Sequence, residues 1–185
     1  MTEKELIQGL REGDEHAFRM LVDQYRNRLY YVLLNLLQDA AEAEDSLQET
    51  FIQVYQSIRS FREESGLYTW VYRIATRKAL ERMRKQKSLR RVQSLLPWWM
   101  PDEKNSVDAV SLNPGIQAER RETANALFRA IKTLPENQRL AFTLIRIQGM
   151  DYEEVCKIMG LGVKAVESLM SRAKENLKRK LKPNN

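Results

Sequence analysis

The sequence predicts an all-α protein of two small helical domains joined by a linker, the C-terminal domain containing a helix-turn-helix. Only seven glycines and five prolines occur in 185 residues, which favours long helices over short strands and turns. Apolar residues recur every three or four positions through both halves of the chain. Residues 92–118 lose this period and hold three of the five prolines. We therefore divide the chain into residues 1–91, 92–118 and 119–185.

The N-terminal half contains two helices with clear apolar faces. The first follows a candidate N-cap at Asp14, and the second covers residues 40–58. The second helix carries a polar stripe opposite its apolar face, at spacing i, i+3, i+4 and i+7. Such a stripe is ordinarily solvated, but an isoleucine among hydrogen-bonding side chains favours a face that binds a partner. The stripe consists of Asp45, Gln48, Glu49 and Ile52, and the expected core positions of that helix are Leu47, Phe51, Val54 and Ile58.

Charge is distributed unevenly along the chain, although its net value is only +6. Residues 67–91 hold nine Lys or Arg against one acid, and residues 164–182 hold seven against two. Residues 1–66, in contrast, carry an excess of acids. Two separated basic segments predict two contacts with a polyanion and leave a different role for the acidic part.

The first basic segment mixes aromatic and cationic side chains. It follows an expected loop over residues 61–66 and contains Tyr68, Trp70 and Tyr72 close to Arg73, Arg77 and Lys78. Rings that stack on bases contribute roughly 1–3 kcal/mol per base, while cations hold the backbone of a single strand. Packing of Trp70 and Tyr72 in the domain core is the alternative, and for Trp70 the pattern supports both equally.

The second half begins with a helix over residues 117–132. Its expected core positions are Ala124, Leu127, Phe128 and Ile131. Pro135 stands near the next helix start, and Gly149 is a candidate C-cap. A short helix then opens with a capping-box pattern, Asp151 followed by Glu154, and ends at Gly160.

The last helix has one apolar stripe and a polar outer face, which together with the preceding short helix predicts a helix-turn-helix. The side chains most suited to base edges are Lys164, Ala165, Ser168, Ser171 and Arg172, whereas Lys174 and the later cations suit phosphates. Glu167 could accept a hydrogen bond from a cytosine or pair with a nearby cation, and we favour the ion pair. The apolar stripe is Val166, Met170, Ala173, Leu177 and Leu181, with Leu169 at its edge.

Several classes of protein are disfavoured by composition. With one cysteine and one histidine, the chain cannot form an internal disulfide and lacks a Cys-rich metal site. No Ser/His/Asp set and no phosphate-binding glycine-rich loop is present, so we expect no enzyme activity, no cofactor and no small-molecule substrate. No apolar run reaches the length of a membrane span, and we expect a soluble, cytoplasmic protein.

Three stretches, taken in order, resemble the bacterial RNA polymerase sigma factors of the sigma-70 family, in the extracytoplasmic-function (ECF) group. The stretch "AEAEDSLQETFIQVYQSI" resembles the segment of the family that binds core polymerase. "FREESGLYTWVYRIATRKALERMRK" is similar to its −10 segment, and "LPENQRLAFTLIRIQGMDYEEVCKIMGLGVKAVESLMSRAKENLKRKL" to its −35-binding domain. The resemblance covers nearly the whole chain except the linker.

This resemblance implies a protein that binds core RNA polymerase and promoter DNA. The stripe of Asp45, Gln48, Glu49 and Ile52 would dock the β′ clamp helices, with the β subunit as a further contact. The implied −10 residues are Phe61, Ser65, Tyr68, Thr69, Trp70, Arg73, Arg77 and Lys78. The implied −35 residues are Lys164, Ala165, Glu167, Ser168, Ser171, Arg172 and Lys174. An anti-sigma factor, often tethered to a membrane in this group, is the expected regulator.

The chain departs from the family at two places. Arg77 stands where many members have Asn, and Glu167 and Leu169 stand where many have basic residues. A different interpretation is a free-standing helix-turn-helix repressor or activator, in which the N-terminal helices form an effector or dimerisation domain. Trp98 and Trp99 in the linker either pack on a neighbouring domain or bind a partner.

Overall fold

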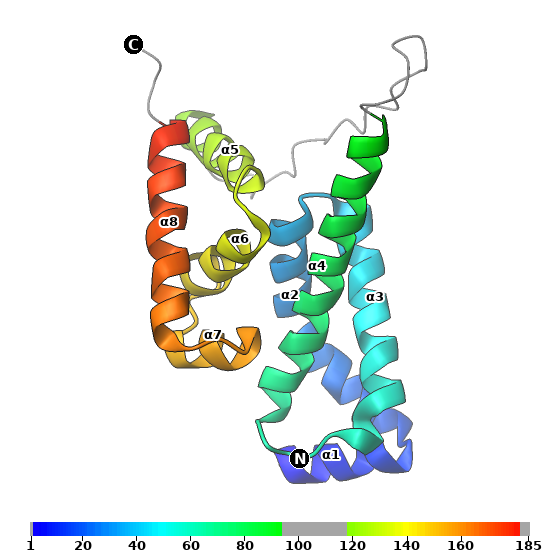
Figure 1. Ribbon diagram of the computed structural model, residues 1–185. Helices are drawn as coiled ribbons and strands as arrows, with labels where there is room; N and C mark the ends of the chain where they lie inside the picture. Colours follow the sequence, from blue (N-terminus) through cyan, green and yellow to red (C-terminus); the bar gives the residue numbers. More distant parts are fainter. Residues whose placement is uncertain (1, 94–117, 182–185) are drawn as a thin grey trace.

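The computed structural model describes residues 2–93 and 118–181, and the regular structure of these two ranges is helical (Figure 1). The elements are α1 (Glu3–Glu12), α2 (Glu15–Leu37), α3 (Ala40–Ser57), a 3-10 turn η1 (Ile58–Ser60), α4 (Leu67–Gln93), α5 (Ala118–Lys132), α6 (Glu136–Phe142), a π-helical turn η2 (Thr143–Ile147), α7 (Tyr152–Met159) and α8 (Val163–Leu181). Most of the predicted linker, with Trp98 and Trp99, lies outside the described residues.

The N-terminal domain is a bundle in which α2, α3 and α4 lie side by side and α1 crosses one end (Figure 1). The predicted core of α3 is confirmed, since Leu47, Phe51, Val54 and Ile58 are all buried. Helix α2 has one buried face that runs from Ala17 to Leu37, and α4 packs against it with small and branched side chains. The buried α4 positions include Leu67, Val71, Ala75 and Ala79.

Side-chain caps fix where the helices of this bundle begin. Asp14 is the N-cap of α2, as predicted, and Asp39 caps α3 by accepting from the backbone N–H of Glu42. Helix α1 was not predicted, although its start has the same chemistry. Thr2 and Glu5 form a capping box there, and the buried face of the helix consists of Leu6, Ile7 and Leu10.

The C-terminal domain confirms the predicted helix-turn-helix. Asp151 and Glu154 form the capping box of α7, and Gly160 ends that helix with φ +65°, a left-handed conformation that favours glycine. Helix α8 buries Val166, Met170, Ala173 and Leu177 as predicted. One local feature was not predicted: the chain after α6 widens into the π-helical turn before Gly149.

Two predicted core residues of this domain are exposed instead. Leu127 of α5 is 37% exposed and Leu181 at the end of α8 is 43% exposed. Ala130 and Ile131, in the last turn of α5, are buried in one cluster with Ala173 and Leu177 of α8. Leu127, one turn earlier, is not part of this buried cluster. Ala124 lies among the residues whose side chains are not described.

The two domains lie against each other and share apolar packing. Helices α6 and α7 contact α4, and η2 contacts α2. Leu140, Leu144, Val155 and Ile158 of the C-terminal domain belong to the same buried cluster as the core of the N-terminal bundle. The sequence predicted two helical domains but not how they pack together, because amphipathic periods do not reveal which surface of one domain meets the other.

Arginine and glutamine side chains join the domains at the C-terminal end of α2. Arg139 of α6 is buried, and its Nη1 donates to the carbonyl of Leu36 over 2.8 Å, while its Nη2 donates to the carbonyl of Lys132 at the end of α5. Carbonyls in a last helical turn have no partner within their helix, and the negative end of the helix dipole favours a cation there. Gln38 adds a hydrogen bond to the carbonyl of Phe128 over 2.5 Å.

We expect Arg139→Leu to lower the free energy of unfolding by about 2–3 kcal/mol, because two buried carbonyls would lose a charged donor. The domains should also separate. Thermal unfolding measures the first effect and small-angle X-ray scattering the second. Arg146→Leu, on an exposed arginine of the same domain, is the matched control. Equal stability of the two variants would contradict this role for Arg139.

Candidate nucleic-acid and partner interfaces

The polar stripe on α3 lies on the surface of the N-terminal bundle. Ile52 is 55% exposed, and the side chain of Asp45 is 64% exposed, while Glu49 is half-buried. The stripe continues one turn further with Tyr55, which is 52% exposed and was not predicted as part of it. Exposed apolar groups bordered by acids and an amide are typical of a protein-binding surface. We call Asp45, Gln48, Glu49 and Ile52 the α3 face.

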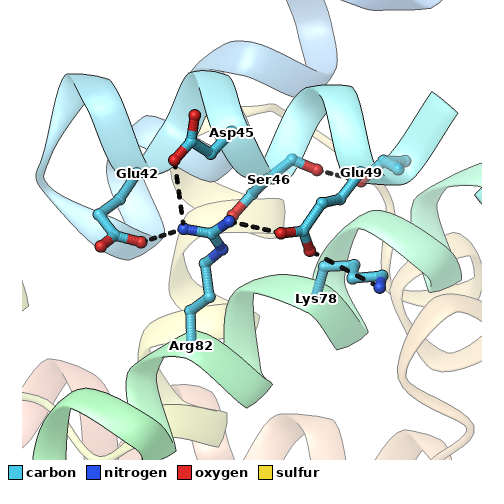
Figure 2. Close-up of polar contacts among 7 residues, drawn as sticks. Glu42, Asp45, Ser46, Glu49, Lys78 and Arg82 are labelled. Carbon is cyan, nitrogen blue, oxygen red and sulfur yellow. Dashed lines mark hydrogen bonds and ion pairs between the residues drawn. The ribbon is translucent and has the colours of Figure 1, made fainter. Parts of the chain in front are cut away.

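Two cations from α4 reach the α3 face (Figure 2). The Arg82 guanidinium contacts Glu42, Asp45 and Glu49, with 2.6 Å between its Nη2 and Oε1 of Glu49. The Nζ of Lys78 lies 3.6 Å from the other oxygen of Glu49. Partial burial acts to raise the pKa of the Glu49 carboxyl, but the hydrogen bond and charge of Arg82, aided by Lys78, outweigh it and lower that pKa. Arg82 was not among the predicted site residues.

The predicted −10 surface on α4 is divided between solvent and core. Arg73 and Arg77 are exposed, and Lys78 is half-buried because it turns towards α3. Tyr68 and Trp70 are half-buried against the apolar core. Trp70 therefore agrees in part with both interpretations, core packing and base stacking. It packs on the core and still borders the open space beside α4.

Two of the predicted −10 residues are buried. Phe61 is 5% exposed and stacks on Trp70 with 4.8 Å between ring centroids, and Thr69 is 7% exposed. Both side chains are covered by the bundle in this structure, and their contact with bases stays a prediction. Thr69, Tyr72 and Thr76 stand at i, i+3 and i+7, so one buried side of α4 carries all three. Tyr72, which the sequence placed among the candidate stacking rings, is fully buried.

The loop over residues 61–66 is held by α1. Arg11 donates from Nη2 to the carbonyl of Phe61 over 2.7 Å and pairs through Nη1 with Glu63 at 2.8 Å. Glu3 accepts from the backbone N–H of Leu67, at the start of α4, over 3.2 Å. Ser65, the predicted −10 residue in this loop, is half-exposed. The sequence did not reveal these contacts because they join residues more than 45 positions apart.

The predicted −35 residues all lie on the exposed side of α8. Lys164, Ala165, Ser168, Ser171, Arg172 and Lys174 are solvent-exposed. Figure 1 shows α8 on the side of the C-terminal domain that faces away from the N-terminal bundle. This face of α8 is therefore free to enter a major groove while the two domains remain in contact.

Glu167 is also exposed, and its predicted ion pair is not formed. Among the contacts of residues 2–93 and 118–181, no salt bridge joins Glu167 to Lys164, Arg172 or Lys174. On a helix the cation at i+5, Arg172, points to another side, and the cation at i+7, Lys174, lies on the same side but two turns, about 10 Å, further along. The reach to Lys164 at i−3 gains little at an exposed site. An unpaired carboxylate on this face agrees better with the alternative of hydrogen bonding to a base.

An open cleft of about 880 Å³ lies beside the contact between the domains, between part of α4 and the C-terminal domain. Its α4 side includes Trp70, Arg73 and Arg77, and its opposite side includes Ile158 and Leu161. Arg73 crosses the boundary by donating from Nε to the carbonyl of Lys157 at 2.8 Å. Part of the basic surface of α4 is thus covered by the helix-turn-helix domain.

Neither a membrane span nor a metal site is found in the described ranges. No helix within residues 2–93 and 118–181 is long and apolar enough to cross a bilayer. The same residues contain no group of three or more His, Cys, Asp or Glu side chains arranged to hold a metal ion.

Two helical domains, one with an exposed recognition helix and one with a basic, aromatic helix, are typical of a DNA-binding transcription protein. Comparison with family models matches sigma-70 region 2 to residues 21–89 and sigma-70 region 4 to residues 124–177. The ECF RNA polymerase sigma-E factor of Haemophilus influenzae is 32% identical over 187 residues, covering 99% of this chain and 97% of that protein. The sigma-E factor of Escherichia coli K12 is also 32% identical, covering 99% and 96%.

The chain therefore belongs to the ECF group of RNA polymerase sigma factors, a family of transcription initiation factors rather than of enzymes. Solved structures share its fold. CnrH, in complex with the cytosolic domain of CnrY, matches with a TM-score of 0.68 at 21% identity over 99% of both chains. RpoE of Bartonella quintana, in complex with the anti-sigma factor NepR, matches with 0.64 at 23% identity over 91% of this chain and 98% of that chain.

Loss of the contacts that Arg11 of α1 makes with the loop over residues 61–66 should make that loop more mobile. We expect Arg11→Ala to make amide hydrogens of this loop exchange about tenfold faster, because a charge-assisted hydrogen bond and a half-exposed ion pair are lost. Hydrogen–deuterium exchange by mass spectrometry measures this. Arg19→Ala removes only an exposed pair with Glu15 and serves as the control. Unchanged protection of the loop would show that α1 does not hold it.

Proposed function

We propose that this sigma factor binds core RNA polymerase through the α3 face and recognises promoters through α4 and α8. In this proposal α4 holds the single-stranded −10 element and α8 reads the −35 element as duplex. The chain performs no catalysis of its own and works in the cytoplasm, where the polymerase is. The observation that carries the proposal is that α3, α4 and α8 each present exposed charged side chains outside the apolar core.

The −10 surface is smaller than the sequence indicated. Arg73 and Arg77 are exposed cations suited to the phosphates of a single strand, and half-buried Trp70 is a ring that lines the same cleft. In this proposal the side chains of Phe61 and Thr69 are buried beneath this surface and do not contact the bases. Arg73 is bound to the C-terminal domain in the free protein, so full use of this surface requires the two domains to separate.

We propose that an anti-sigma factor regulates the chain. Support comes from the RpoE structure, a sigma factor of the same fold whose complex contains the anti-sigma factor NepR. Each of the two domains has exposed apolar side chains that such a partner could contact. Leu161 and Val163 lie in the turn before α8 and at its start, and Ile52 and Tyr55 lie on α3.

Run-off transcription with purified core polymerase tests the main proposal. Adding the chain should give transcripts from defined start sites, and Glu49→Lys should weaken binding to core polymerase by on the order of tenfold or more, because a reversed charge meets a surface matched to an acid. Glu44→Lys is the control, since Glu44 lies on α3 outside the α3 face and pairs with Arg26.

Two results would oppose the main proposal. If core polymerase gave the same transcripts without the chain, initiation would not depend on it. If the chain alone bound a palindromic duplex tightly, a free-standing repressor or activator would be the better description.

Replacement of Arg172 separates base reading from phosphate binding at the −35 element. We expect Arg172→Ala in the holoenzyme to cost about 1–3 kcal/mol at one base pair and little elsewhere. Fluorescence anisotropy with a set of single-base duplex variants measures this. Lys178→Ala should instead weaken all duplexes evenly and make the salt dependence shallower. An even loss for Arg172→Ala would assign it to the phosphates.

A further inference from the structure

Arg82 lies behind the α3 face, and neither the sequence pattern nor the family resemblance assigns it a role. We infer that Arg82 is a positioning residue for polymerase binding, which holds Asp45 and Glu49 in the orientation that meets the polymerase. The inference rests on the proposed docking role of the α3 face. With Arg82, a residue of α4 contributes to a docking surface whose other members all belong to α3.

The geometry places one guanidinium between three carboxylates (Figure 2). Nη1 of Arg82 pairs with Glu42 and lies 3.8 Å from Asp45, while Nη2 lies 2.6 Å from Glu49. The three acids stand at i, i+3 and i+7 on α3, so they share one side of that helix. The planar fork of an arginine suits several carboxylates at once, which the single ammonium of a lysine cannot match.

The arginine supports the acids without covering them. Only 20% of the Arg82 side chain is exposed, compared with 45% for Glu49 and 64% for Asp45. The neighbouring α4 residues Ala79 and Met83 are buried in the bundle, which fixes the stem of Arg82. The Asp45 oxygen that does not face Arg82 therefore remains open to a partner, and Glu49 is still partly exposed although Arg82 and Lys78 each contact one of its oxygens.

Positioning of this kind favours binding for two physical reasons. Three like charges on one helix side repel one another, and the guanidinium offsets that repulsion while the protein is free. A glutamate that is already held in one rotamer also loses less conformational freedom when a partner binds. Glu49 is held from two sides, by Arg82 at one oxygen and by Lys78 at the other.

The decisive experiment compares Arg82→Met with the parent chain in equilibrium binding to core polymerase. We expect binding about tenfold weaker, the order of effect seen when charge-assisted hydrogen bonds at a partly exposed site are removed. Lys85→Met is the matched control, because Lys85 is an exposed cation on the same helix and has no role in the α3 face. Thermal unfolding of each variant verifies that the bundle is intact.

A double-mutant cycle separates positioning from a general structural effect. In a Glu49→Gln background, Arg82→Met should have clearly less effect than in the parent chain, because the carboxylate that it holds is gone. Arg82→Lys should give an intermediate loss, since lysine keeps the charge but reaches fewer carboxylates at once. If Arg82→Met fails to fold, the same cycle with Arg82→Lys decides the question.

Each result distinguishes this inference from the proposed function. Weaker binding that depends on Glu49 supports the positioning role. Unchanged or tighter binding of Arg82→Met, while Glu49→Lys still weakens binding, overturns the positioning role and leaves the α3 face in place. An equal loss in the Glu49→Gln background also overturns it. If Glu49→Lys bound core polymerase with full affinity, the α3 face would not be the docking surface, and the proposed function itself would be contradicted.

Discussion

The α3 face and the proposed −10 surface both depend on how α4 is held, because this one helix meets three different neighbours. Its apolar side, with Leu67, Val71 and Ala75, fills the core of the N-terminal bundle. A second side sends Lys78 and Arg82 to the acids of α3. The exposed cations that remain are then divided between solvent and the C-terminal domain. A helix that is fixed on several sides cannot rotate to improve one contact without losing another.

The contact between the domains has unequal consequences for the two DNA surfaces. Arg73 donates to a carbonyl at the end of α7 and Arg84 pairs with Glu136 of α6 at 3.0 Å, so the cations of α4 help to hold the domains together. The outer side of α8 takes no part in that contact. In the proposed mechanism the −35 surface is therefore ready in the free protein, whereas the −10 surface becomes complete only when the domains separate.

Local chemistry made much of the fold predictable. The caps at Asp14 and Asp151, and the left-handed residue at Gly160, act within a few positions of the chain, so their effect is readable in one short stretch. The apolar face of α8 follows from helical period alone and was predicted almost completely. Helix α1 was missed although it carries the same signals, a Thr2–Glu5 capping box and an apolar side. Its position could not be predicted, because Arg11 acts on a loop 50 residues away.

Helical period, capping and charge are local properties, so the sequence was enough to predict the helical class, the helix-turn-helix, the polar stripe on α3 and the two basic segments. Tertiary structure alone decided which side chains of those segments are usable. Phe61 and Tyr72 carry rings that could stack on bases, yet both are buried, because the core of the bundle needs their apolar volume. Arg82 looked like one more cation in a basic helix, and only the approach of α3 gave it three carboxylates to hold.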